Sequence, residues 1–449
     1  MMYVPYPAVS EAERLQASPQ LDLSLCCSVP TLDEFSDIDI SGARVAMWPS
    51  GPMLFLAGQF GSQYGIDLTN SEYVFEITQA QADANAMQFS EESGLGSDLE
   101  FLGMLERDQW TFTGFYDPLR PFYLYESQDG SGTLLYVSSL SGDVVMDSTR
   151  VERGWNWVGA VIHWLYPQIL RSNTQVWFWV VVVLTCLSLF LTITGIYVAI
   201  KYLNFKKPGS LSPFRGWGLW HHYIGLIFGL LTLTWLISGL LSVEPFTALQ
   251  GRSTNLERSI AQGAPFIFDA NIRASIRALE NAEFPEDVVN IEYSLADGQL
   301  GAVAEDKDGG RTAYNPSTWQ PQLRDPQYFP DIAQRVRPQM SIEQQGWIER
   351  EDSYYYSRRT DPALPAYRVV YEDGERAYLD GVSGELNYYI TKPRQWNRWL
   401  FNGLHSLDFN NFIRQRPLWD ILLWLTLGGV TAGSITGTWL GIRRLIPKN

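Results

Sequence analysis

The stretch VWFWVVVVLTCLSLFLTITGIYVAI, residues 176–200, contains no charged side chain. About 20 consecutive apolar residues are enough for a helix to cross the hydrocarbon core of a bilayer. Two further stretches meet this requirement, at 217–243 and 417–442, although Asp420 lies near the start of the last one. Buried helices of soluble proteins seldom stay apolar on every face over such a length. The sequence therefore predicts a membrane protein with an α-helical transmembrane bundle of three spans in a lipid bilayer.

Basic residues indicate which side of the membrane each remaining segment occupies. Short loops rich in Lys and Arg stay in the cytoplasm. The loop 204–216 and the tail 443–449 contain three basic residues each, so both are expected to be cytoplasmic. The long segments 1–154 and 244–395 then lie on the opposite side and account for the net charge of −16. An acidic exterior of this kind argues against nucleic acid as a partner.

These assignments divide the chain into six parts. The expected order is an outer domain (1–154), an interfacial segment with the first span (155–203), the cytoplasmic loop (204–216), the second span (217–243), a second outer domain (244–395), and a second interfacial segment with the third span and the cytoplasmic tail (396–449).

The two halves of the chain repeat each other. With a shift of 242 residues, Trp157 falls on Trp399 and His163 falls on His405, and the register holds without a gap from residue 136 to 201. Each outer domain contains a β-prone run, a Ser-Gly turn and a second β-prone run, the pattern of a strand pair. The sequence thus predicts two α+β domains related by internal duplication.

The duplication also predicts a fourth span. In the second copy a span precedes the outer domain, at 217–243, and the same shift places its counterpart just before Met1. We therefore expect that an N-terminal transmembrane helix is missing from this chain. The alternative is a three-span protein whose N-terminal domain is carried across the membrane by the first span.

All four histidines lie next to predicted spans. His163 and His405 occupy equivalent positions before the first and third spans, and His221 and His222 stand at the start of the second. Ionisable residues at membrane depth are costly and usually functional. Two imidazoles at one depth can bind a haem iron from both faces, whereas zinc needs further ligands that the neighbouring sequence does not supply. The alternative is that interfacial His and Trp only anchor the helices.

Cysteine offers no other metal or cofactor site. The chain has no C-x-x-C-H or C-x-x-C sequence. Cys26 and Cys27 are adjacent, which argues against a routine structural disulfide between them.

Three features together resemble the PepSY-associated transmembrane proteins. They are the sequence WHHYIGL (220–226) leading into a span, the sequence WLFNGLHS (399–406) before the last span, and the paired outer domains with a Ser-Gly turn. The resemblance covers essentially the whole chain. It implies two PepSY-like periplasmic domains on a multi-pass protein of the bacterial inner membrane, and some members of the family are siderophore-iron reductases with b-type haems.

The resemblance and the histidines together predict a function. We expect haem b bound by His163 and His405, with His222 or His221 at an inner site that the missing helix would complete. Such a protein would take electrons from a quinone or a cytoplasmic donor and reduce a periplasmic acceptor, as a haem-dependent ferric (siderophore) reductase does. The alternative is a non-enzymatic PepSY scaffold or regulator that binds an exported peptide or protein.

Overall fold

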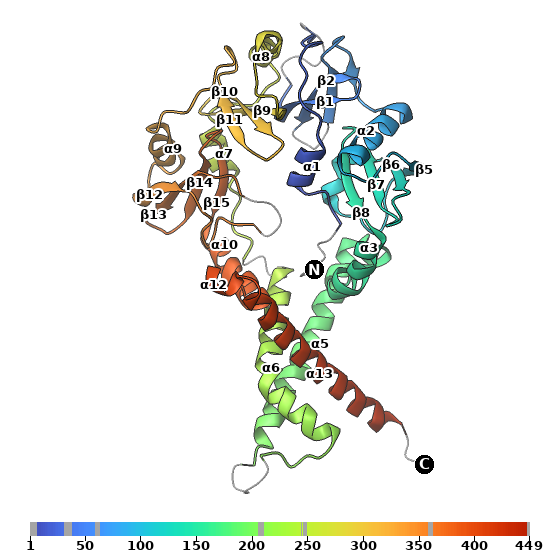
Figure 1. Ribbon diagram of the computed structural model, residues 1–449. Coiled ribbons are helices and arrows are strands. Elements are labelled where there is room, and N and C mark those ends of the chain that lie inside the picture. Colours follow the sequence, from blue (N-terminus) through green and yellow to red (C-terminus); the bar gives the residue numbers. More distant parts are fainter. Residues whose placement is uncertain are drawn as a thin grey trace. The chain divides into compact units, whose positions relative to one another are not determined.

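The computed structural model forms two compact units, which we describe separately (Figure 1). The first comprises Met1–Ser172 and Ser253–Tyr389, and the second comprises Asn173–Arg252 and Ile390–Asn449. The structure describes residues 7–30, 38–58, 63–204, 211–243, 245, 249–357 and 362–446. Lys206, Lys207 and Lys448, which support the expected orientation, and the position before Met1 lie outside the described residues.

A seven-stranded antiparallel sheet joins both halves of the chain within the first unit. Its strand order is β11-β10-β9-β1-β2-β3-β4. The pairing of β1 with β9 aligns Arg44 with Glu292 and Val45 with Ile291. The strands are β1 Ile40–Trp48, β2 Gly51–Gly58, β3 Gln63–Asp67, β4 Tyr73–Val74, β9 Val288–Ala296, β10 Gln299–Asp306 and β11 Arg311–Tyr314. The expected outer domains thus share one sheet.

Two four-stranded sheets follow the same plan. Their strand orders are β5-β6-β7-β8 and β12-β13-β14-β15, and we call the regions around them the first lobe and the second lobe. The strands are β5 Leu99–Leu105, β6 Phe122–Ser127, β7 Leu134–Ser138, β8 Val144–Ser148, β12 Ile342–Ile348, β13 Ala366–Tyr371, β14 Arg376–Asp380 and β15 Leu386–Ile390.

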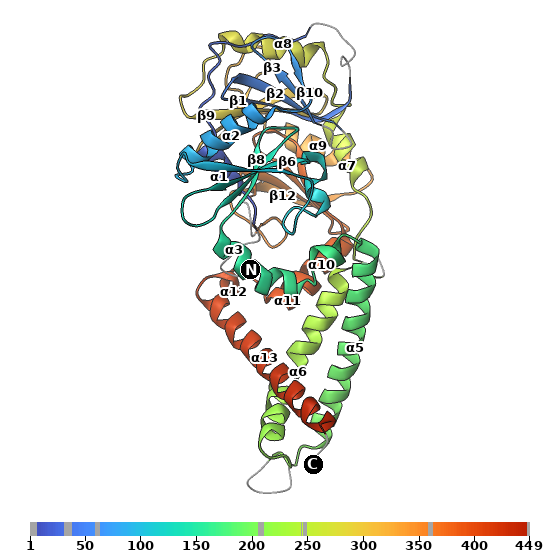
Figure 2. The same cartoon turned by 90° about the vertical axis from the view of Figure 1, so that its right-hand side faces the viewer.

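Short helices cover these sheets. In the first unit they are α1 Glu11–Ala17, α2 Gln79–Glu92, η1 Gly114–Leu119, α3 Arg150–Asn156, η2 Trp157–Val161, α4 Gln168–Arg171, α7 Asn255–Gln262, α8 Ala270–Ala278, η3 Leu279–Asn281 and α9 Tyr328–Val336. Helix α8 lies over one face of the seven-stranded sheet and α2 over the other (Figure 2).

Alternating side chains on β2 build two cores at once. Leu54 and Leu56 pack with α8 on one face, whereas Met53 and Phe55 pack with α2 and the strands of the first lobe on the other. Successive side chains of a strand point to opposite faces, so a strand that is apolar at every position must be covered on both sides. The second lobe has its own core between α9 and strands β13 to β15.

The structural features of the two halves correspond closely. A cis-proline precedes β6 at Arg120-Pro121 and β13 at Leu364-Pro365. Strands β9, β10 and β11 each begin 248 residues after β1, β2 and β3. A π-helix occurs in both interfacial segments, at Trp157–Val161 (η2) and Arg398–Gly403 (η4). These correspondences are compatible with the repeat predicted from the sequence.

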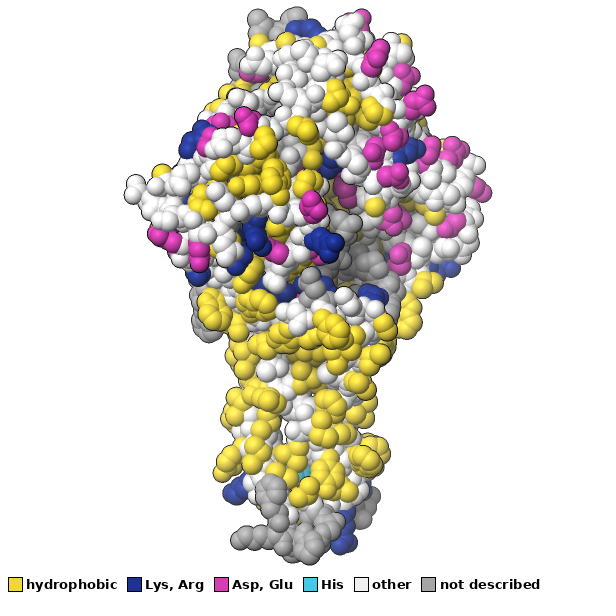
Figure 3. Space-filling view, turned by 60° about the vertical axis from the view of Figure 1, so that its left-hand side comes forward, with side chains coloured by type: hydrophobic (Ala, Val, Ile, Leu, Met, Phe, Trp, Pro, Cys, Tyr) yellow, Lys and Arg dark blue, Asp and Glu magenta, His cyan; other side chains and the backbone are white. Residues whose placement is uncertain are grey.

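Three long helices make up most of the second unit. They are α5 Thr174–Lys201, α6 Trp217–Ser242 and α13 Leu418–Leu445, and each is long and apolar enough to cross a membrane, as predicted. Apolar side chains cover these helices on the face that Figure 3 shows, whereas Asp and Glu gather on the first unit. The shorter elements are α10 Lys392–Asn397, η4 Arg398–Gly403, α11 Leu404–Ser406 and α12 Asn411–Arg414.

Helix α6 packs against both α5 and α13. Its contact with α13 depends on glycines spaced by four, since a Cβ at Gly429 would stand 2.3 Å from the Phe228 ring and one at Gly433 would stand 3.2 Å from Ile224. Small residues let two helices approach closely in this way.

One feature differs from expectation in the first unit. Cys26 and Cys27, whose adjacency argued against a routine disulfide, form a disulfide in the structure.

Candidate functional site

His405 lies at the end of the interfacial segment of the second unit. The π-helix η4 runs directly into the single turn α11 that carries this histidine. Its Nδ1 is 3.1 Å from the Ser238 hydroxyl on α6, and the Phe401 ring stacks on the imidazole at 5.1 Å. The imidazole also lies against α6 at Gly239, where a Cβ would be in ordinary van der Waals contact with Cε1 at 3.5 Å. Single turns of π-helix are frequent at functional sites.

A buried ion network holds this segment in place. The Arg398 guanidinium donates to the Asp408 carbonyl at 2.8 Å and to its carboxylate at 3.3 Å, and Arg414 Nε donates to the same carboxylate at 2.9 Å. Asp408 is fully buried. The Trp419 indole of α13 also donates to the Ser406 carbonyl at 2.9 Å. Removing one partner from a buried ion network costs folding free energy, so these contacts hold the backbone around His405 in place.

His163 follows the other π-helix, η2, in the first unit. Val161 is buried in the core of the first lobe, and Gln109 bonds the segment at both the Tyr166 carbonyl and the Gln168 amide. The His163 side chain is exposed, and partial desolvation lowers its pKa, which favours the neutral imidazole that a metal needs. His163 and His405 belong to different units. Their pairing across one iron therefore stays a prediction.

His221 is positioned in the same way as His405 at the opposite end of α6. Its Nδ1 is 3.1 Å from the Thr436 hydroxyl of α13, and a Cβ at Gly437 would stand 2.9 Å from its Cε1. His221 and Gly239 are five helical turns apart, so they share one face of α6 at a separation of about 27 Å. An imidazole with a hydroxyl partner therefore lies near each end of α6. At one end His221 of α6 contacts Thr436, and at the other His405 contacts Ser238 of α6.

His222 has a different environment from its neighbour. The ring is buried, its Nε2–H donates to the Ala199 carbonyl at 2.8 Å, and its Nδ1 is 2.7 Å from the Ser212 hydroxyl. A carbonyl only accepts, so Nε2 carries the proton and Nδ1 accepts from the serine. Both ring nitrogens are therefore used within the protein, which suits a structural contact between α5 and α6.

The donor set limits which cofactor these histidines could hold. Among the described residues no three His, Cys, Asp or Glu side chains gather in a group that could hold a metal ion. A haem needs only axial ligands, and a hydroxyl on Nδ1 fixes the tautomer and orientation of an imidazole that binds through Nε2. His405 and His221 have this hydroxyl partner.

The sequence did not reveal the residues that orient these imidazoles. Ser238 and Thr436 lie inside apolar spans, where hydroxyl side chains also bond their own helix backbone, so their residue type does not indicate this role.

The sequence did indicate a second pair of contacts. Tyr136 and Tyr378, matched in the repeat, donate to the equivalent carboxylates of Asp108 at 2.6 Å and Asp352 at 2.9 Å.

Comparison with known proteins gives no relative from which to transfer a function. No protein-family model, no curated protein and no solved structure matches the chain.

Proposed function

We propose that this chain is a multi-pass protein of the bacterial inner membrane, built by duplication of a PepSY-like unit, that carries electrons through b-type haem to a periplasmic acceptor. Three apolar helices and the matching strands and π-helices of the two halves support the architecture. The observation that carries the redox proposal is the anchored imidazole of His405, which follows a π-helix in a segment repeated at His163.

The haem would supply one-electron chemistry, and the chain would supply its ligands and surroundings. His405 and His163 would be the outer axial ligands, with Ser238 orienting His405 through Nδ1. His221 is the better candidate for an inner ligand, because the nitrogens of His222 already bond Ala199 and Ser212. The donor would be a quinone or a cytoplasmic protein.

The acceptor would be a ferric chelate. In the proposed orientation the acidic first unit faces the periplasm, and a negative surface favours an encounter with cationic or neutral chelates over anionic ones. The activity would then be that of a ferric (siderophore) reductase.

Haem content after expression with ample haem tests this proposal. The purified full chain should show Soret absorption, and His163→Ala and His405→Ala should each reduce it. His222→Gln is the control and should keep the haem, since that ring is used in a structural contact. Absence of Soret absorption, or unchanged haem in both alanine variants, would refute the redox function.

A second variant separates positioning from ligation. Ser238→Ala removes the Nδ1 partner of His405 without removing the ligand, so it should retain haem and change its reduction potential. Ser242→Ala, one turn further along α6, loses only a bond to the Gly239 carbonyl and should leave the potential unchanged. Equal potentials in both variants would show that Ser238 does not orient the ligand.

One observation favours the alternative of a peptide-binding scaffold. Strand β5 is an edge strand of the first lobe, and its Leu102 and Met104 side chains are exposed. An exposed edge can accept an extended peptide as an added strand. This function predicts no bound cofactor and a partner that crosslinks to β5.

A further inference from the structure

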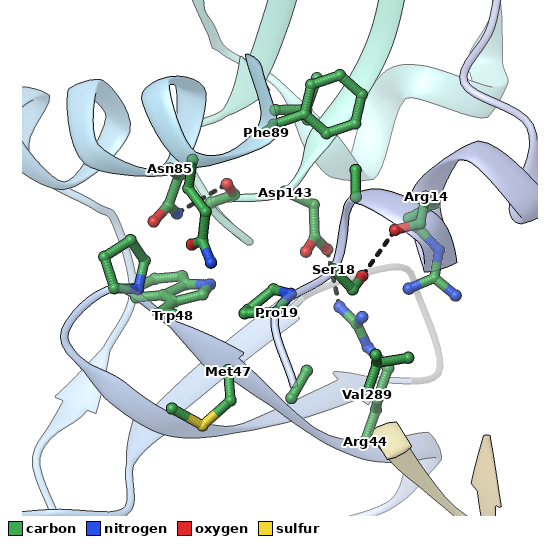
Figure 4. Close-up of a pocket in the computed structure, with 16 residues that line it drawn as sticks. Arg14, Ser18, Pro19, Arg44, Met47, Trp48, Asn85, Phe89, Asp143 and Val289 are labelled. Carbon is green, nitrogen blue, oxygen red and sulfur yellow. Dashed lines mark hydrogen bonds and ion pairs between the residues drawn. The ribbon is translucent and has the colours of Figure 1, made fainter. Parts of the chain in front are cut away.

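A pocket lies under the seven-stranded sheet, in the first unit. Helix α1, strand β1, helix α2 and the Ser-Gly turn between β7 and β8 line it, and its volume is about 70 Å³ (Figure 4). A water molecule needs about 10–15 Å³ of such space, so the cavity has room for a small organic group.

The indole of Trp48 gives this pocket an unsatisfied hydrogen-bond donor. Trp48 is only 6% exposed, yet among the described residues its Nε1 finds no hydrogen-bond partner. Figure 4 shows this ring at the pocket wall, beside Asn85 and Pro19. Buried indole N–H groups are nearly always paired, because an unpaired buried donor costs free energy. A ligand that accepts a hydrogen bond would satisfy Trp48.

The charges around the pocket select the kind of acceptor. Arg14 and Arg44 both line it, and Asp143 is the one carboxylate among the lining residues. Arg44 bonds Asp143 at 2.8 Å, and Arg14 pairs with Glu11, which is not among the lining residues, so the lining itself carries one more positive than negative charge. A guanidinium has five N–H donors, so Arg14 and Arg44 each keep donors that could bind a second carboxylate.

The equivalent turn in the second lobe is filled by a side chain of the protein. A Cβ at Gly384 would stand 2.3 Å from Arg324 Nε, and that nitrogen donates to the Ser383 carbonyl at 2.7 Å. In the first lobe the counterpart Gly142 instead contacts the Trp48 ring, and its carbonyl accepts from Asn85 at 2.8 Å. Both turns are therefore packed by a side chain, an arginine in the second lobe and the indole of Trp48 in the first, and it is Trp48 that brings the pocket lining to this turn.

We propose that the pocket of the first lobe binds a small carboxylate, with Trp48 Nε1 donating to one oxygen and Arg14 supplying charge. The carboxylate could belong to a free small acid or to the C-terminus of a short peptide. This site is independent of the haem ligands, so it stands whether or not the chain binds haem.

Calorimetric titration of the full chain in detergent tests the proposal, with acetate as probe and acetamide as its uncharged counterpart. Acetate should bind and acetamide should not. Triglycine should bind if the natural ligand is a peptide terminus, and its C-terminal amide should not; binding of acetate without triglycine assigns the site to free acids.

Two variants with matched controls link binding to this pocket. Trp48→Phe removes the indole donor and should weaken acetate binding about tenfold, whereas Trp319→Phe, whose Nε1 donates to the Ser275 carbonyl, should not. Arg14→Gln should weaken it similarly, and Arg335→Gln, a change of equal charge on α9, should not. Failure of the native chain to bind acetate, or unaltered affinity in both pocket variants, would overturn the proposal.

Discussion

Glu385 provides a test of the electrostatics of the second lobe. The side chain follows the Ser-Gly turn before β15, and Oε1 accepts a long bond of 3.4 Å from the Leu295 amide. Burial, with Asp380 and Glu292 nearby, raises the pKa of Glu385 from 4.5 to about 7. Between these values the folded chain keeps a proton that the unfolded chain has lost, so stability falls as pH rises from 4.5 to 7.

The size of this effect follows from the shift. One pKa unit corresponds to about 1.4 kcal/mol, so ionised Glu385 costs about 3 kcal/mol once the pH exceeds 7. Glu385→Gln keeps the shape and an acceptor oxygen but cannot ionise. The native chain should therefore lose about 3 kcal/mol of unfolding free energy between pH 4.5 and 8 that the variant does not lose.

Hydrogen–deuterium exchange of the β15 amides in the full chain is the appropriate assay, because it reports opening of the second lobe even if the two units unfold separately. The opening constant of the native chain, divided by that of the variant, should rise on the order of 100-fold over this pH range. Asp143→Asn is the control. It removes the partner of Arg44 and should cost up to about 1 kcal/mol at pH 7. A constant ratio for Glu385→Gln would show that Glu385 is not held protonated.

Two further predictions concern packing. Tyr136→Phe should cost about 1.5–3 kcal/mol because it removes a buried bond to the Asp108 carboxylate, whereas Tyr388→Phe, at an exposed ring, should cost less than about 0.5 kcal/mol in thermal unfolding. Gly429→Ala should destabilise the contact of α6 with α13 by about 1–3 kcal/mol, because its Cβ would overlap a Phe ring on α6. Gly441→Ala meets nothing within 4 Å and should be neutral; equal effects at both glycines would contradict the packing.

The sequence predicted the elements that depend on local composition. The spans expected at 176–200, 217–243 and 417–442 agree with α5, α6 and α13 to within three residues at each end. A long apolar run carries this information without reference to any other segment. The repeated Ser-Gly turns between strands were equally visible, because glycine is needed where φ is positive, as at Gly142 (72°) and Gly384 (79°).

The remaining features arise from contacts between distant segments. The pairing of β1 with β9 joins residues about 250 positions apart, and the residues of either strand do not indicate which other strand it pairs with. The two π-helices are a hydrogen-bonding pattern rather than a residue pattern. From the sequence and the family resemblance, His222 was the preferred inner ligand and His221 the alternative. Only the positions of Thr436 and Ala199 distinguish the two environments in the structure.

The centre of the seven-stranded sheet is where the two halves meet and where they differ. Arg44 and Glu292 face each other across β1 and β9, and they occupy equivalent positions in the repeat. Arg44 pairs with Asp143 in the turn of the first lobe, whereas Glu292 adds negative charge beside Glu385 in the turn of the second. The first lobe thus has an ion-paired carboxylate beside a pocket, whereas burial, with a smaller contribution from Asp380 and Glu292, raises the pKa of the equivalent carboxyl group of the second lobe to about 7. Carboxylate binding and pH sensitivity should therefore be separable: Glu385→Gln should leave acetate affinity unchanged, and Trp48→Phe should leave the pH dependence of β15 exchange unchanged.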